Sequence, residues 1–138
     1  MNFVLDSSVI IGALVESEKK HLQCRRILEK LKNREFVALE SYIVLVEVVS
    51  AIRRRTGSMN LAERIKIDLQ NIGSIYFLEF VSIRAEKAAE IAKETGLKGM
   101  DSIIVQIAQE FNCDVVSLDE EILNRGSKVV GVKNVDDF

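Results

Sequence analysis

The chain has 138 residues, of which 48% are hydrophobic and 29% are charged, and its formal net charge is −2. This size and apolar content suit one domain over residues 1–138, and seven glycines with no proline exclude a collagen-like or low-complexity chain. No apolar run approaches the ~20 residues of a membrane span and the N-terminus is not a secretory signal, so we expect a cytoplasmic protein without membrane contact.

The first elements are a short strand, a sharp turn and a helix. The apolar run Phe3–Leu5 ends at Asp6, which is typical of a buried strand followed by a polar turn. Ser7 and Ser8 are good N-cap residues, and they predict a helix over Val9–Leu14.

Helical and strand patterns then alternate to the end of the chain. Apolar periodicity predicts further helices over 19–32, 41–55, 60–72, 84–95, 100–111 and 120–124, and strands over 36–39, 75–80, 114–118 and 128–132. The helix over 41–55 is ambiguous because Ile43–Val49 is rich in β-branched residues, but its length and the Ser41 cap favour a helix. Asn60 is the predicted cap of the next helix.

Short apolar strands that alternate with amphipathic helices indicate right-handed crossovers and a parallel sheet with both faces covered. We therefore expect the α/β class: a three-layer α/β/α sandwich around a central parallel sheet of about four or five strands. In such folds ligands bind beyond the carboxyl ends of the strands.

Four acidic residues interrupt apolar sequence, where an ionised carboxylate needs a partner. Asp6 and Asp119 each end an apolar strand, and Asp101 lies in the first turn of a strongly apolar helix. Glu47 interrupts the apolar run between Ile43 and Val49. A common pocket for the four acids would explain all of these positions.

Each acid also has a structural alternative. Asp6 and Asp119 could simply cap the helices that follow them, and Asp101 suits the positive end of a helix dipole. Glu47 could be an isolated exposed residue. Ser7 and Ser117 could hydrogen-bond a site carboxylate or a metal-bound water, or could cap the backbone.

The other reactive residue types give no competing site. Cys24 and Cys113 have no second cysteine or histidine at metal-ligand spacing and are expected to be reduced thiols. His21, the single histidine, lies among lysines on an expected exposed helix face. A net charge of −2 does not by itself favour nucleic acid, although Arg53, Arg54 and Arg55 form a basic run.

Oxygen ligands without histidine or cysteine select a hard cation, so the pocket predicts Mg²⁺, with Mn²⁺ as a substitute. A water made more acidic by such a cation can attack phosphorus while the cation offsets charge on the phosphate oxygens. The acid cluster therefore indicates phosphoryl or phosphodiester chemistry.

Four segments give the chain its resemblance to the PIN-domain family, and within it to the VapC-type toxin ribonucleases. They are Val-Leu-Asp6-Ser-Ser, Glu47 in the helix after the second strand, Gly-Met-Asp101-Ser-Ile-Ile-Val-Gln-Ile-Ala, and Val-Val-Ser117-Leu-Asp119. Each segment is short, but the ordered set extends over nearly the whole chain.

The resemblance implies an Mg²⁺-dependent endoribonuclease, the toxin of a type II toxin–antitoxin pair. Asp6 and Asp101 would be the principal metal ligands, with Glu47 and Asp119 completing the acidic pocket. It also implies a homodimer, an RNA substrate and inhibition by a small VapB-like antitoxin, for which the exposed sides of residues 41–72 are the expected docking surface.

Other functions remain open on the sequence. Haloacid-dehalogenase-like phosphatases need a second aspartate two residues after the first, where this chain has Ser8. Receiver domains need an acidic pair and a late lysine, and they have no counterpart of Glu47. A PIN-like RNA-processing nuclease outside a toxin pair, or a non-catalytic module that binds RNA or protein, are the remaining alternatives.

Overall fold

The first strand, β1 (Asn2–Leu5), lies at the centre of a sheet of five parallel strands in the order β3-β2-β1-β4-β5. The computed structural model describes all residues, 1–138. The other strands are β2 (Val37–Ser41), β3 (Ile75–Leu78), β4 (Asp114–Val116) and β5 (Val132–Lys133). Every neighbouring pair is parallel, which confirms the predicted α/β/α sandwich and its sheet of four or five strands.

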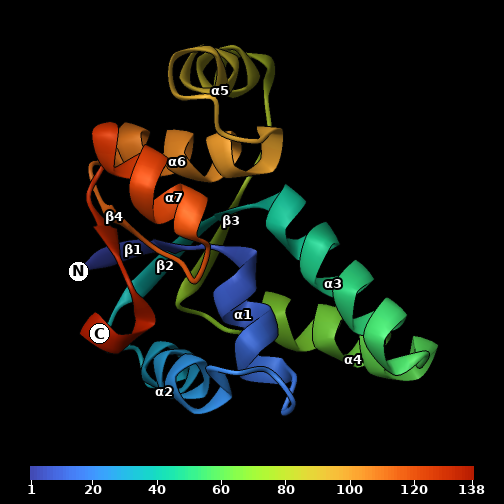
Figure 1. Cartoon of the computed structure of the whole chain (residues 1–138). Helices are drawn as coiled ribbons and strands as arrows, with labels where there is room; N and C mark the ends of the chain where they lie inside the picture. The colour runs from blue at the N-terminus through green and yellow to red at the C-terminus, as the bar shows by residue number, and fades with distance from the viewer.

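Seven α-helices connect and cover the strands. They are α1 (Ser7–Leu14), α2 (His21–Lys32), α3 (Tyr42–Thr56), α4 (Met59–Gln70), α5 (Ser82–Thr95), α6 (Gly99–Phe111) and α7 (Glu120–Arg125). Two 3-10 turns, η1 (Gly126–Lys128) and η2 (Val135–Asp137), flank β5. Figure 1 shows α1 to α4 on one side of the sheet and α5 to α7 on the other. No helix is both long enough and apolar enough to cross a membrane.

The connections leave β1 in opposite directions across the sheet. The chain passes from β1 to β2 and β3 on one side, and then returns through α5 and α6 to β4 on the other side of β1. The carboxyl ends of β1 and β4 therefore flank a topological switch point, which is where open α/β sheets bind ligands. Asp6 directly follows β1, and Asp119 lies three residues beyond β4.

One continuous apolar core joins the sheet to α1, α2, α3 and α6. Val4, Ala38 and Val115 are completely buried on the three central strands, and Ile104 and Ile107 of α6 pack into the same core. This packing fixes α6 against β1, β2 and β4.

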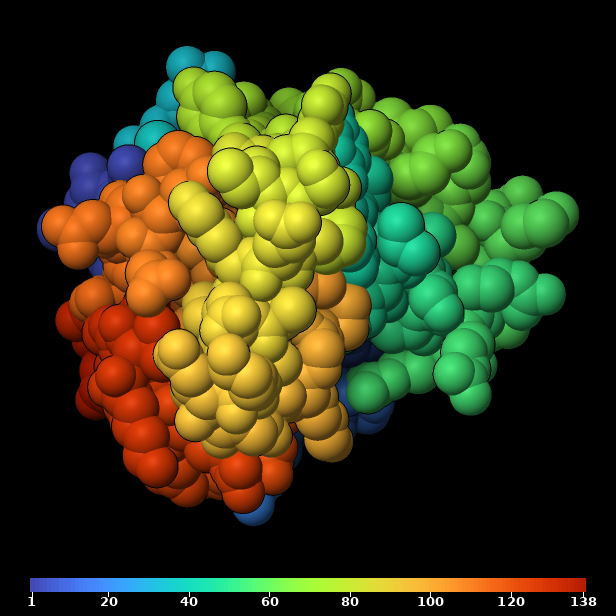
Figure 2. All heavy atoms as spheres, turned by 90° about the horizontal axis from the view of Figure 1, so that it is seen from above, coloured from blue at the N-terminus to red at the C-terminus, as the bar shows by residue number.

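The helix that sequence propensity left ambiguous is α3, and it is a helix. The Ser41 hydroxyl accepts a hydrogen bond from the Ile43 amide at its start, and Gly57 ends it with φ +67°. Val44, Val48 and Ile52 form its buried face, so tertiary packing outweighs their β propensity. α3 and α4 project together from the body of the molecule as an arm (Figures 1 and 2).

Some predicted boundaries are wrong. α4 begins at Met59, and its cap is Ser58, whose hydroxyl accepts from the Leu61 amide; Asn60 lies inside the first turn. The sequence predicts the last strand over 128–132, but β5 covers only Val132–Lys133. Lys128 belongs instead to the 3-10 turn that follows α7. Both errors concern turn geometry, which apolar periodicity does not report.

Candidate functional site

The four candidate acids line one cavity at the carboxyl ends of β1 and β4. The cavity has a volume of about 400 Å³ and is lined by ten residues: Asp6, Ser7, Ser8, Ile11, Glu18, Glu47, Arg55, Asp101, Leu118 and Asp119. Five of these side chains are carboxylates. The fold thus brings Asp6, Glu47, Asp101 and Asp119 together from four separate segments.

Asp6 is the most buried of the four and is held by two hydroxyls. One carboxylate oxygen, Oδ2, accepts hydrogen bonds from Ser8 Oγ at 2.6 Å and from Ser117 Oγ at 2.9 Å. Its backbone amide donates to the Val116 carbonyl, which joins the end of β1 to β4. Asp6 is the N-cap residue of α1, but its side chain makes no capping hydrogen bond. The carboxylate therefore faces the cavity rather than the helix end.

The role expected for Ser7 and Ser8 as helix caps is not what the structure shows. Both residues lie inside the first turn of α1, and their hydroxyls bind carboxylates. Ser7 donates to Glu47 and Ser8 donates to Asp6, so the start of α1 orients two of the four acids. These hydroxyls therefore donate to site carboxylates and do not cap the backbone at the start of α1.

Glu47 reaches the cavity from α3, where its partly buried side chain lies beside the buried face of that helix. Its neighbours Tyr42 and Val46 are exposed, so the apolar run around Glu47 is only partly buried. The bond from Ser7 ties Glu47 to α1 and orients its carboxylate.

Asp101 lies in the first turn of α6 and is partly buried. Its Oδ2 atom is buried without any hydrogen-bond partner. Burial, together with the negative charges of Asp6, Asp119 and Glu47, raises the pKa of Asp101 to about 6 against the opposing effect of Lys98. An unpartnered carboxylate oxygen surrounded by like charge is a favourable place for a cation.

Asp119 has two contacts of different kinds. Its Oδ1 atom accepts from the amides of Glu121 and Ile122 and so caps α7, which is the structural role that the sequence left open for Asp119. Its own amide donates to Ser117 Oγ, which also donates to Asp6. Ser117 therefore links Asp6 to Asp119, and the capping bonds fix the position of the Asp119 carboxylate beside the cavity.

The acids also influence each other electrostatically. Burial is the main cause of the raised pKa of Asp6, and the charges of Glu47 and Asp119 add to it, while the bonds from Ser8 and Ser117 oppose it. A shared cation would relieve this mutual repulsion. As the side chains stand, no three acidic, histidine or cysteine residues converge into a closed metal shell. Mg²⁺ does not need one, because it typically keeps several waters and binds through one or two carboxylates.

Sequence reasoning missed a second buried acid besides Asp6, namely Glu40 near the end of β2. Its side chain is completely buried, and Oε1 accepts from the Leu5 amide at 2.7 Å, while Oε2 has no partner. Burial raises the pKa of Glu40 well above its ordinary range, and the Asp6 charge adds to this. The signal was present, since Glu40 follows an apolar strand just as Asp6 and Asp119 do.

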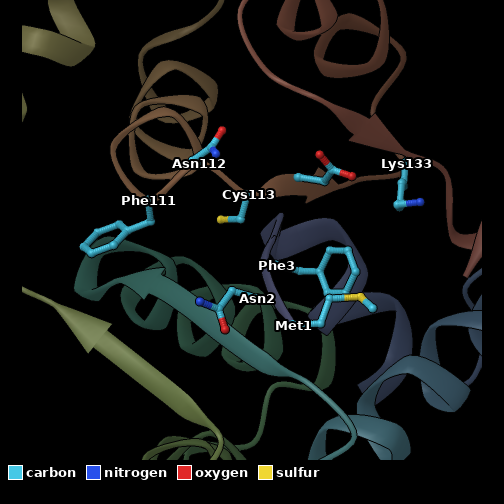
Figure 3. Close-up of a pocket in the computed structure, with 8 residues that line it drawn as sticks. Met1, Asn2, Phe3, Phe111, Asn112, Cys113 and Lys133 are labelled. Atoms are coloured by element: carbon cyan, nitrogen blue, oxygen red, sulfur yellow. The ribbon is translucent and has the colours of Figure 1, made fainter.

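A larger cavity lies at the opposite rim of the sheet, beside the amino ends of β1 and β4 (Figure 3). Its volume is about 490 Å³, and Figure 3 shows Asn2, Cys113 and Lys133 around it. Asp114 is its single carboxylate. The two cysteines of the chain are free thiols, as expected. The acid cluster and the largest cavity are therefore at different ends of the strands.

Comparison with known proteins agrees with this architecture. The model of the PIN domain family matches residues 3–128, while no curated protein matches the chain by sequence. A toxin–antitoxin complex from Klebsiella pneumoniae contains a chain with TM-score 0.72 and 17% identity, covering 98% of each chain. VapC20 of Mycobacterium tuberculosis, a toxin that cleaves the sarcin-ricin loop, has TM-score 0.69 and 16% identity, covering 87% of this chain and 91% of that one.

A third similar structure is PAE2754 of Pyrobaculum aerophilum, with TM-score 0.67 and 20% identity, covering 99% of this chain and 94% of that one. Identities this low show a common fold. The family model covers most of the chain, including Asp6, Glu47, Asp101 and Asp119. This chain therefore belongs to the PIN-domain family.

Proposed function

We propose that the chain is an Mg²⁺-dependent endoribonuclease that hydrolyses RNA phosphodiester bonds, and that Asp6, Glu47, Asp101 and Asp119 carry the reaction. The observation that carries the proposal is their convergence on one cavity, with the buried Asp101 Oδ2 atom lacking any donor. Membership of the PIN family and the likeness to VapC20, a toxin that cleaves RNA, support it.

The residues present fit an Mg²⁺ ion. All potential metal-ligand atoms around the cavity are carboxylate or hydroxyl oxygens, which hard cations prefer. Burial and neighbouring negative charges raise the pKa values of Asp6 and Asp101, so a bound cation would stabilise their ionised forms. When bound in such a site, Mg²⁺, or Mn²⁺ in its place, activates water and offsets charge on the phosphate oxygens.

The chain's own residues have distinct tasks in this proposal. Asp6 and Asp101 are the principal ligands, because one is buried and fixed by two hydroxyls and the other has a free buried oxygen. Asp119 and Glu47 complete the acidic wall. Ser7 and Ser117 orient the carboxylates through hydrogen bonds, and do not contact the substrate.

We also propose that the protein is the toxin of a type II pair, that a VapB-like antitoxin binds it and that it forms a homodimer. Similar chains occur in complexes described as VapBC from Salmonella typhimurium and as a toxin–antitoxin complex from Klebsiella pneumoniae. On this chain, Val46 of α3 and Met59 of α4 are 67% and 73% exposed, which supports the arm as the surface for an antitoxin helix.

Cleavage of a structured RNA in the presence of Mg²⁺ tests the enzymatic proposal. Asp6→Asn and Asp101→Asn should each lower the rate at least about a hundredfold, because they remove a ligand charge, while circular dichroism should show an intact fold. Glu120→Gln, an exposed acid beside the site, is the matched control and should stay within about twofold of wild type. Equal cleavage in EDTA, or full activity in both asparagine variants, would refute the mechanism.

A further inference from the structure

Arg55 is the single basic side chain among the ten residues that line the acidic cavity. It lies in the last turn of α3, two helical turns beyond Glu47, which places the two residues about 12 Å apart along the helix axis. Lys98 lowers the pKa of Asp101 but does not line the cavity. Any anion that enters the cavity therefore meets five carboxylates and one guanidinium.

The Arg55 guanidinium forms an ion pair with Glu18, which lies in the connection between α1 and α2. The pair lies at the mouth of the cavity, with 48% of the Arg55 side chain and 31% of the Glu18 side chain exposed. Exposed pairs of this kind contribute about 0–1 kcal/mol, so another anion can displace Glu18 at little cost.

Its two neighbours differ from Arg55. Arg53 and Arg54 are also exposed in the last turn of α3, where a cation suits the negative end of the helix dipole. Neither of them lines the cavity or forms an ion pair. A helix-dipole role would explain all three arginines, but it does not explain why one of them extends across the cavity mouth.

An RNA substrate needs a positive group at this position. The acidic wall repels phosphates, and a bound cation offsets only part of its charge. A guanidinium binds a phosphate through two parallel hydrogen bonds, which fixes both the position and the orientation of the strand. We propose that Arg55 leaves Glu18 and binds an RNA backbone phosphate next to the one that is cleaved. This inference rests on the proposed ribonuclease function.

The test compares Arg55→Ala with Arg54→Ala, which removes the same charge one residue away. In steady-state cleavage of an RNA hairpin, Arg55→Ala should raise KM about tenfold or more and change kcat less than about threefold, because the lost contact binds ground state and transition state alike. Arg54→Ala should stay within about twofold. The slope of log KM against log salt should fall by about one, which corresponds to one lost phosphate contact, in Arg55→Ala alone.

Glu18→Gln separates this role from a structural one. If Arg55 binds phosphate, removing its competitor should leave KM unchanged or lower it. If the ion pair only joins the α1–α2 connection to α3, Glu18→Gln should reproduce the defect of Arg55→Ala, and that outcome overturns the proposal. Equal KM values for Arg55→Ala and Arg54→Ala also overturn it.

A binding experiment tests the same proposal without cleavage. Anisotropy in Mg²⁺ measures the affinity for a fluorescein-labelled RNA hairpin, with the Asp101→Asn protein as background. Adding Arg55→Ala should weaken binding about tenfold, and adding Arg54→Ala should not. If the wild-type chain cuts no RNA, the proposed function fails, but this binding experiment still decides whether Arg55 binds phosphate. Equal affinity of the two double variants refutes the role of Arg55.

Discussion

Glu40 shows how a single buried side chain supports the position of the site. The ladder between β1 and β2 pairs Asn2 with Val37 and Phe3 with Ala38, and beyond it the Leu5 amide donates to Glu40 instead of to a backbone carbonyl. Leu5 directly precedes Asp6. Glu40 therefore satisfies the last backbone donor on this side of β1 before the chain reaches the cavity.

We predict that Glu40→Leu destabilises the protein by about 1–3 kcal/mol, because it leaves the Leu5 amide buried without an acceptor. Glu40→Gln keeps an acceptor of the same shape. Burial raises the pKa of Glu40 well above its ordinary range, which favours the neutral carboxyl group, so the glutamine variant should stay within about 1 kcal/mol of wild type. Urea unfolding at pH 7 measures both values. An equal loss in the two variants would show that the carboxyl group itself is required.

At the scale of elements, the arm formed by α3 and α4 has two functional sides. Glu47 and Arg55 line the acidic cavity, whereas Val46 and Met59 leave apolar side chains in solvent. A second exposed apolar group, Tyr76, Phe80, Val81 and Ile83, follows the edge strand β3 into α5. The first suits an antitoxin helix, and the second lies at an unpaired sheet edge where a second copy of the chain could pack.

We predict that a short gene immediately upstream of the gene for this chain encodes a small protein, and that this protein co-purifies with the wild-type chain when the two are co-expressed. Val46→Asp combined with Met59→Asp should abolish co-purification, because it charges the proposed docking surface. Leu22→Asp changes an equally exposed apolar residue on α2. It is the matched control and should leave co-purification intact. Light scattering on the same samples reports the mass, and a dimer mass is expected. Loss of the partner in the control as well, or in neither variant, would contradict the surface.

Much of the fold follows from the sequence, since the strand–helix alternation and the Ser41 cap mark the elements correctly. Local capping chemistry was the weaker guide: Ser58 rather than Asn60 caps α4, and Ser7 and Ser8 donate to acids rather than capping α1. In each case a serine or asparagine side chain has several possible hydrogen-bond partners, and the tertiary structure determines which of them it binds.

Chain position explains which site residues the sequence revealed. Asp6, Glu47, Asp101 and Asp119 stand out because charge interrupts apolar sequence. Arg55 lies in a basic run and Glu18 among polar residues, so neither is distinctive until α3 and the α1–α2 connection meet over the cavity. Contacts of this kind depend on the path of the chain in three dimensions.

For the molecule as a whole, the acid cluster links stability to pH and to metal. The pKa values of Asp6, Glu40 and Asp101 are all raised, so the folded chain binds more protons than the unfolded chain; for Asp101, whose pKa is about 6, this difference lies between about pH 4 and pH 6. The contribution of these groups to stability is therefore present at low pH and is lost as pH rises through their folded values. At pH 7, above the pKa of Asp101, the metal-free protein carries the repulsion between this carboxylate and its acidic neighbours.

The melting temperature in EDTA and in Mg²⁺, at pH 5 and pH 7, tests the central claim that the four acids form one cation site. We predict that Mg²⁺ at a hundredfold excess over its Kd raises the melting temperature at pH 7 by about 9 °C, and by less at pH 5, where protons compete with the metal. Asp101→Asn should lose this increase, whereas Glu120→Gln should retain it. No increase in the wild type at pH 7, or an equal increase in Asp101→Asn, would contradict the account.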